Sequence, residues 1–403
     1  MGGRPAVWRK LCSLSRWLLQ APILPLALLA IVVIRLIRPL IIVRLAVLDS
    51  HRLGHFSLTP ENYLCRLKEG INIPNRPFID LWCHTYPICN RQLQRMWERL
   101  LIFAPTWVIL PLYKANRMLP GYKRHLAIES IRAHRDLLGR HPSHLHFLPA
   151  EEAQGQEGMR VIGVPDNARF VCLNVRDSAY LDRALPGHDW RYHNYRDSNI
   201  QNYILATQEL VKRGYYVIRM GAAVNQAINI AHPMIVDYAA NGMRSDFMDI
   251  YLSSKCEFFI STGTGLDTVA EVFRRPYMLI NFMPIEDVHS YRDDLIFLPK
   301  KHFLLTENRF MTFPEIFRSG AGRFALGSQY EAMGIDPIEN TPEEIAAVVL
   351  EMERRLNGTW QTTEEDEALQ RRFWELFPKS ELHGEIRCRI GAEFLCQNKA
   401  WLE

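Results

Sequence analysis

The 403-residue chain is predicted to be an α/β protein with two domains, each built around a parallel sheet. Its length suffices for two domains of ordinary size with cores of their own. Between residues 169 and 281, short apolar runs alternate with helical runs of roughly ten to fifteen residues, which is typical of a doubly wound sheet. Residues 40–138 show the same alternation with weaker strand signals, so a second α/β domain is expected there.

The composition is that of a globular protein, with 48% hydrophobic and 23% charged residues. The first fifty residues hold seven Lys and Arg and a single acid, Asp49, so they carry +6 and the remainder −2 of the net +4. We therefore expect no nucleic-acid binding by the body of the chain. The eight cysteines are scattered without a Cys-x-x-Cys pair, which favours reduced thiols over disulfides or a zinc site.

Residues 1–37 are predicted to form a basic and apolar segment that associates with a membrane. Trp17–Ile34 runs without a charge for eighteen residues, the lower limit for a membrane span, and Pro22 and Pro25 interrupt it. Basic residues flank it on both sides, so they indicate no orientation across a bilayer. We expect an apolar helix lying in the cytoplasmic leaflet, with a buried helix of a soluble fold as the alternative.

The first α/β domain is expected over residues 38–150. Leu40–Leu48 reads as its first strand, and Asp49–His55 as a turn rich in His and Arg. Further elements are expected as a strand at Phe78–Cys83 and helices at 60–68, 91–103, 107–118 and 122–138. Residues 139–168 lack periodicity and read as a linker.

The second domain is expected over residues 151–340, followed by C-terminal helices over 341–403 that pack back on the body. Its predicted strands are 169–175, 215–220, 257–261 and 277–281, and its predicted helices are 199–213, 245–254 and 266–275. Thr341 is followed by Pro and Glu, the signature of a helix start, and a charged helix is expected at 363–376.

Polar residues gather where the strands of the second domain end. The word Asn-x-Arg-Asp-Ser appears twice, at Asn174–Ser178 and Asn194–Ser198, and the first copy follows a buried strand. In open α/β sheets, ligands meet the carboxyl ends of the strands. Thr262–Gly265 is a tight turn between a strand and a helix, a place where backbone N–H groups favour a phosphate.

These features indicate an enzyme that binds a diphosphate. The candidate donor-binding residues are Arg176, Arg196 and Arg219 for the diphosphate, Ser261, Thr262, Gly263, Thr264 and Gly265 for phosphate, and Glu271 for a ribose hydroxyl. Each candidate also has a structural alternative. Arg176 and Asp177 read equally as a buried pair, Asp197 or Ser198 as a helix N-cap, and Glu271 as a solvated helix residue.

Several words in the chain carry a family resemblance: Arg52–Phe56, Cys89–Leu93, His193–Asp197, Arg244–Asp249 and Ser261–Gly265. Over roughly residues 35–400 they resemble a bacterial family of glycosyltransferases associated with surface polysaccharide gene clusters, and His-Asn-Tyr-Arg-Asp is the most specific word. The resemblance implies two Rossmann-like domains facing across a cleft (GT-B), with a nucleotide-sugar donor in the C-terminal half. It implies no assignment of catalytic residues.

The sequence predicts no metal and no other cofactor for such a transfer. The Asp-x-Asp motif that holds a metal in the other common transferase fold is absent from the chain, so arginines would neutralise the leaving diphosphate. An inverting transfer also needs a base for the acceptor hydroxyl. Asp177, His193, Asp197 and His55 are the catalytic candidates.

The resulting prediction is a metal-independent glycosyltransferase at the cytoplasmic face of the bacterial inner membrane. Its partners would be a nucleotide-sugar donor, a lipid-linked or polysaccharide acceptor and the membrane surface. A nucleotide-sugar epimerase of the same fold and a non-catalytic nucleotide-binding scaffold of a polysaccharide assembly complex are the alternatives. A nicotinamide enzyme is disfavoured, because no Gly-x-Gly-x-x-Gly follows a strand.

Overall fold

A computed structural model describes residues 23–128, 135–184, 189–380 and 382–403. The chain divides into two compact units, Met1–Ile131 and Arg132–Glu403. The division lies before the boundary expected at residue 150, which falls inside the helix α6 (Pro149–Val161).

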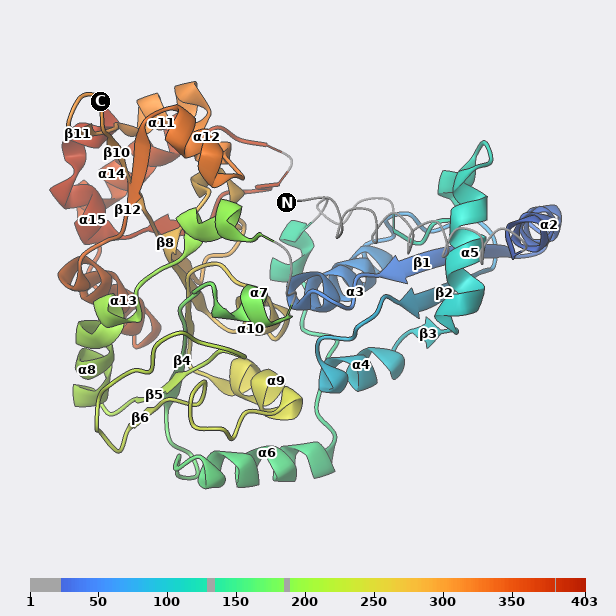
Figure 1. The fold of residues 1–403 in the computed structure, drawn as a ribbon, viewed down its shortest axis with the longest axis horizontal. Coiled ribbons are helices and arrows are strands. Elements are labelled where there is room, and N and C mark those ends of the chain that lie inside the picture. Colours follow the sequence, from blue (N-terminus) through green and yellow to red (C-terminus); the bar gives the residue numbers. More distant parts are fainter. Residues whose placement is uncertain (1–22, 129–134, 185–188, 381) are drawn as a thin grey trace, which may run out of the picture. The chain divides into compact units, whose positions relative to one another are not determined.

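The first unit contains a three-stranded parallel sheet in the order β1-β2-β3 (Figure 1). The strands are β1 (Ile42–Leu48), β2 (Phe78–His84) and β3 (Ile102–Phe103). The helices are α2 (Ile23–Leu36), α3 (Leu53–Lys68), α4 (Arg91–Glu98) and α5 (Thr106–Arg117). Ala27 and Ile31 of α2 share a core with Leu45, Cys83 and Ile109. Within the described part of the chain, no helix is both long enough and apolar enough to cross a membrane.

The two longer strands of this unit were predicted correctly, and three other expectations were wrong. The helix α3 begins at Leu53, so His55 lies in its first turn and not in a loop. The helix expected at 91–103 ends at Glu98, and the last two residues of the expected range, Ile102 and Phe103, form β3. The helix expected at 122–138 is reduced to short 3-10 turns in its described part. The reason is tertiary, because Leu126 bridges to Leu45 and the His125 ring lies 2.8 Å from the carbonyl oxygen of Val43.

The second unit is built on a seven-stranded parallel sheet in the order β13-β9-β8-β7-β4-β5-β6, which confirms the α/β class. The strands are β4 (Phe170–Asn174), β5 (Tyr216–Arg219), β6 (Ile235–Val236), β7 (Phe259–Ser261), β8 (Tyr277–Phe282), β9 (Leu295–Pro299) and β13 (Arg389–Ile390). A small antiparallel sheet joins β10 (Lys301–Leu304), β11 (Arg309–Phe310) and β12 (Ile335–Ile338).

Helices cover both faces of the large sheet. α8 (Ile204–Lys212) packs with α13 (Pro342–Leu356) on one side, and α9 (Asp246–Lys255) with α10 (Asp267–Val272) on the other (Figure 1). The remaining helices are α7 (Ala179–Ala184), α11 (Phe313–Ser319), α12 (Gly327–Ala332), α14 (Glu364–Leu376) and α15 (Ala392–Gln397). The helix start predicted at Thr341 is confirmed, since its hydroxyl accepts a backbone N–H of α13, and Ser245 caps α9 in the same way.

Two segments of this unit differ from the expectation. The predicted linker 139–168 contains α6, whose Gly155 and Gly158 are poor helix formers. A Cβ at Gly155 would stand 2.1 Å from the Tyr251 ring, so the glycine permits close packing against α9. Beyond the fourth predicted strand, where no further strand was predicted, the chain forms β9, which is buried along its whole length.

Candidate functional site

The loops that follow β4 and β7 meet at the carboxyl edge of the large sheet. The two strands are parallel neighbours, and Asn174 pairs with Ser261 at their ends. The backbone N–H of Arg176 donates to the Thr262 hydroxyl at 2.9 Å. The first Arg-Asp-Ser word and the Gly-Thr-Gly turn, distant in the sequence, are therefore in direct contact.

Three cationic side chains converge on this edge. Arg176 Nε donates to Asp197 Oδ1 at 2.9 Å, and Arg196 Nη2 donates to the carbonyl oxygen of Gly263 at 2.5 Å. Lys300 follows β9 directly, and its Nζ donates to the backbone carbonyl of Asp197 at 2.6 Å. Two arginines of the predicted set thus lie beside a lysine that the sequence analysis did not select.

The electrostatics of this cluster favour an anionic ligand. Burial lowers the pKa of Lys300, which is 5% exposed. Burial and the charge of Arg176 lower the pKa of Arg196. Burial raises the pKa of Asp197, against the opposing effect of Arg176. The carboxylates of Glu339 and Asp336 also act on Lys300, and those of Asp267 and Asp287 on Arg196. Arg176 nevertheless repels both cations, and bound phosphate oxygens would relieve this repulsion.

The segment after Asp197 is held by the partly buried carboxylate of Glu339. This carboxylate accepts hydrogen bonds from the Ser198 hydroxyl at 2.7 Å, the Asn199 backbone N–H at 3.0 Å and the Asn202 side chain at 2.9 Å. Asn281, at the end of β8, donates to Ser198 at 2.9 Å. The N-cap of the following turn is Asn199, and neither Asp197 nor Ser198 takes that place.

The turn from Ser261 to Gly265 is closed by its own side chains. The Asp267 carboxylate accepts from the Ser261 hydroxyl at 2.7 Å and from the Thr264 N–H at 2.8 Å, while the Gly263 N–H donates to Ser261. Burial raises the pKa of Asp267 to about 6, although the two hydrogen bonds oppose this. A phosphate would have to displace this carboxylate to reach the amides, so the cationic side chains are the better candidates for anion ligands.

The conformation of the turn and its close packing require glycine at position 263. Its φ is +79°, and a Cβ there would stand 2.7 Å from the Phe282 ring. A side chain at this position would be strained and would collide, so glycine permits the close approach of the turn to β8.

Two residues of the predicted site, Arg219 and Asp177, make hydrogen bonds that stabilise the fold around them. Arg219 is 1% exposed, and its guanidinium donates to Asp237 Oδ2 at 3.2 Å and to the carbonyl oxygen of Gln226. The Asp177 carboxylate accepts backbone N–H groups from Ala179 at 3.0 Å and Asn225 at 2.7 Å. The partners of Arg219 thus differ from those of Arg176 and Arg196, with which the sequence analysis had grouped it.

Glu271, His193 and His55 complete the predicted set. Glu271 is 1% exposed, so the reading as a solvated helix residue is wrong. Its burial opposes ionisation, but His289 at 3.1 Å and the Tyr291 hydroxyl lower the pKa of Glu271 to about 2. His193 lies among the aromatic rings that surround it in the turn 191–196. His55 belongs to the first unit, where it lies in α3.

No protein-family model and no curated protein matches the sequence. Solved structures with a similar fold include the E. coli ADP-heptose LPS heptosyltransferase II, 14% identical with a TM-score of 0.35, covering 58% of this chain and 83% of that one. A family 9 glycosyl transferase from Veillonella parvula is also 14% identical, with a TM-score of 0.36, covering 58% and 79%. The iron-containing dodecameric glycosyltransferase TibC from E. coli is 11% identical, with a TM-score of 0.32, covering 66% and 60%. At this level of similarity, the function of this chain has to be argued from its own residues.

Lys300 and Glu339 are the site residues that sequence reasoning missed. Lys300 follows the apolar run Leu295–Pro299, which is the same signal that singled out Arg176 after β4. Recognition of that run as a strand would have found the lysine. Glu339 carries no such signal, because its contacts with Ser198 and Asn202 arise only in the folded chain.

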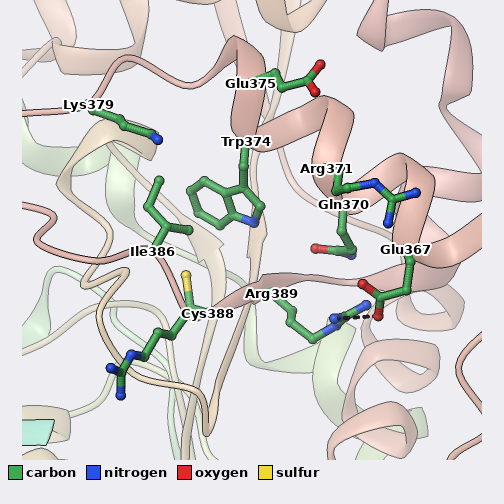
Figure 2. Close-up of a pocket in the computed structure, with 10 residues that line it drawn as sticks. Glu367, Gln370, Arg371, Trp374, Glu375, Lys379, Ile386, Cys388 and Arg389 are labelled. Atoms are coloured by element: carbon green, nitrogen blue, oxygen red, sulfur yellow. Dashed lines mark ion pairs between the residues drawn. The ribbon is translucent and has the colours of Figure 1, made fainter.

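A cavity of about 380 Å³ lies elsewhere in the second unit, between α14 and β13 (Figure 2). Figure 2 shows the Trp374 ring at its centre with Ile386 beside it. Arg389 pairs with Glu367 at 2.9 Å in its wall. None of the residues at the strand ends described above lines this cavity, so we place the candidate site at the strand ends.

Proposed function

We propose that this chain transfers a sugar from a nucleoside diphosphate donor to a lipid-linked or polysaccharide acceptor, without a metal ion. The observation that carries the proposal is the convergence of Arg176, Arg196 and Lys300 around Asp197 at the carboxyl edge of a parallel sheet. Ligands of open α/β sheets bind at this edge, and guanidinium groups suit diphosphate through their paired donors. The two-domain GT-B arrangement and a site on the cytoplasmic face of the inner membrane belong to this proposal.

In the proposed reaction, an acceptor hydroxyl attacks the anomeric carbon while the bond between that carbon and the diphosphate oxygen breaks. The negative charge that develops on the leaving diphosphate is stabilised by the three cations. Asp197 is the candidate base nearest to them, and burial raises its pKa toward the range useful for proton transfer. Asp177 is less suited, because backbone amides occupy both of its oxygens.

Metal-independence is supported by two properties of the acidic residues. The sequence has no Asp-x-Asp, and of the acidic pair Asp293–Asp294 the second member accepts from Arg292 Nε at 2.6 Å. The cations of the cluster would then do the work that a divalent ion does in metal-dependent transferases.

A thermal-shift screen tests the donor class. The full chain would be melted with UDP, ADP, GDP and dTDP and their sugar conjugates, with EDTA present throughout. A ligand that binds only the folded state raises the melting temperature by mass action. We expect one nucleoside diphosphate to do so. Binding without turnover of any donor would favour the scaffold, and no shift with any nucleotide would contradict the proposal.

Arg176→Ala tests the cationic cluster. We expect it to weaken binding of the identified nucleotide about tenfold or more, because a charge-assisted hydrogen bond contributes about 1.5–3 kcal/mol. Isothermal titration calorimetry would measure the affinity, and circular dichroism would confirm folding. Arg213→Ala is the matched control, since Arg213 pairs with Glu209 on a helix surface of the same unit. Unchanged affinity in both Arg176→Ala and Arg196→Ala would rule out the cluster as the diphosphate site.

A further inference from the structure

The outer face of α2 is a concentrated patch of exposed apolar side chains. Its members and those of the turn after it are Leu26 (69% exposed), Leu29 (63%), Val33 (50%), Leu36 (71%) and Leu40 (76%). The helix carries no charge before Arg35 near its end. Monomeric soluble proteins rarely expose contiguous apolar patches of this kind without an interaction partner.

This face is presented by a helix that the rest of the unit holds in place. On the opposite side of α2, Ala27 and Ile31 are buried in the core that the helix shares with α5 and the sheet. Arg35 Nη1 donates to the carbonyl oxygen of Pro120 at 2.7 Å, and its Nη2 donates to Asn116 Oδ1 at 2.8 Å. The exposed apolar face therefore belongs to a helix that is packed in the folded unit, because the opposite face of the same helix already contacts the core.

Arginines gather at the end of this face. The charges of Arg35, Arg38 and Arg124 all act on the buried His125, lowering its pKa together with the larger effect of burial. Arg38 and Arg124 are exposed. Three arginines therefore lie around His125, close to the end of α2.

The whole first unit is strongly basic. Residues 1–131 hold 18 Lys and Arg against 6 Asp and Glu, a formal +12, whereas residues 132–403 hold 30 against 38, a formal −8. The apolar patch fits an apolar layer, and the arginines beside it fit a layer of negative charge on top of that layer. An anionic bilayer has this chemistry.

We propose that the outer face of α2 docks on an anionic lipid bilayer, with Leu26, Leu29, Val33 and Leu36 inserted among the acyl chains and Arg38 and Arg124 at the phosphate groups. This deepens the proposed function and rests on its membrane-side acceptor, because it names the surface that would hold the enzyme there.

Vesicle flotation of the full chain tests this surface. Wild type should bind vesicles of phosphatidylcholine mixed with phosphatidylglycerol, and bind pure phosphatidylcholine more weakly. A variant with Leu26→Gln, Leu29→Gln, Val33→Gln and Leu36→Gln should bind the mixed vesicles about tenfold more weakly or worse, because it loses the apolar area that inserts. Arg38→Gln with Arg124→Gln should lose the preference for the anionic lipid.

The matched control carries the same chemical change at exposed apolar residues elsewhere, as Ile73→Gln, Ile102→Gln, Val161→Gln and Leu305→Gln. It should bind vesicles as wild type does. Equal binding by wild type and the α2 variant would overturn the proposal, and so would a wild-type oligomer that the α2 variant converts to a monomer in light scattering. The nucleotide-induced thermal shift of the α2 variant should equal that of wild type. A loss of vesicle binding with that shift retained separates docking from the donor site.

Discussion

At the scale of single residues, environment separates two arginines that look alike in the sequence. Arg176 and Arg219 each stand at the end of a predicted strand of the same domain. The Arg176 side chain is 15% exposed beside Arg196 and Lys300, whereas the buried Arg219 donates through Nη1 to Asp237 and Gln226. We therefore expect Arg176, and not Arg219, to contact the donor.

Arg219→Ala should therefore act on stability. Removal of one partner of a buried ion pair leaves Asp237 without its counter-charge and costs about 3–5 kcal/mol. Urea denaturation would measure the loss. Arg213→Ala, which breaks a partly exposed pair, should cost about 1 kcal/mol or less. Full stability of Arg219→Ala with lost nucleotide binding would instead return Arg219 to the donor site.

His302 gives the fold a defined sensitivity to acid. It is 1% exposed in β10, and burial lowers its pKa to about 4 from an ordinary value of 6.5. The unfolded chain therefore binds a proton in a pH range where the folded chain does not. The contribution of His302 to stability is complete above about pH 6.5 and is lost as the pH falls toward about 4.

His302→Phe should remove this dependence of stability on pH while keeping an aromatic ring beside Tyr330. Between about pH 7.5 and pH 5, wild type should lose about 2 kcal/mol more unfolding free energy than the variant, as an order of magnitude. Chemical denaturation at the two pH values measures the difference. Parallel losses in the two proteins would show that His302 is not the group responsible.

At the scale of elements, the candidate site depends on how strand ends and turns are tied together. Strands β4, β7 and β9 place Arg176, Thr262 and Lys300 at one edge. The carboxylate of Glu339, which lies between β12 and α13, then holds the segment that carries Arg196 and Asp197. The rigidity of the segment 198–202 therefore depends on this partly buried carboxylate.

Glu339→Gln should loosen the segment 198–202. The amide that replaces the carboxylate keeps one acceptor, and its NH₂ group faces donors, so about 1–3 kcal/mol of local stability is lost. Amide hydrogen exchange should accelerate at Asn199 and its neighbours. Glu343→Gln, at an exposed position of the α13 first turn, is the control and should leave exchange unchanged. Equal protection in both variants would remove Glu339 as the anchor.

At the scale of the whole molecule, charge is divided between the two units. The basic excess was expected within the first fifty residues, yet residues 51–131 add another +6, with 11 Lys and Arg against 5 acids. The charge of −2 for residues 51–403 is thus the sum of +6 for residues 51–131 and −8 for residues 132–403.

The second unit should fold and bind the nucleotide alone. All seven strands of its sheet and all three cations of the candidate site lie within residues 132–403. A protein of these residues should melt cooperatively and show the nucleotide affinity of the full chain within about threefold, since the standard error of additive reasoning is of that order. Folded protein without nucleotide binding would mean that the donor site needs residues of the first unit.

Local patterns in the sequence determined the α/β class, the strands β1, β2, β4, β5, β7 and β8, and the starts of α9 and α13. These features depend on the periodicity of apolar residues and on bonds between residues three apart, both of which are visible along the chain. Only the tertiary structure showed that α6 replaces a linker, that Lys300 lies with Arg176 beside Asp197, and that Arg219 pairs with Asp237. Each of these outcomes depends on a partner distant in the sequence: Tyr251 for Gly155, Asp197 for Lys300 and Asp237 for Arg219. The sequence shows which interactions a side chain is able to make, but the folded structure determines which residue becomes its partner.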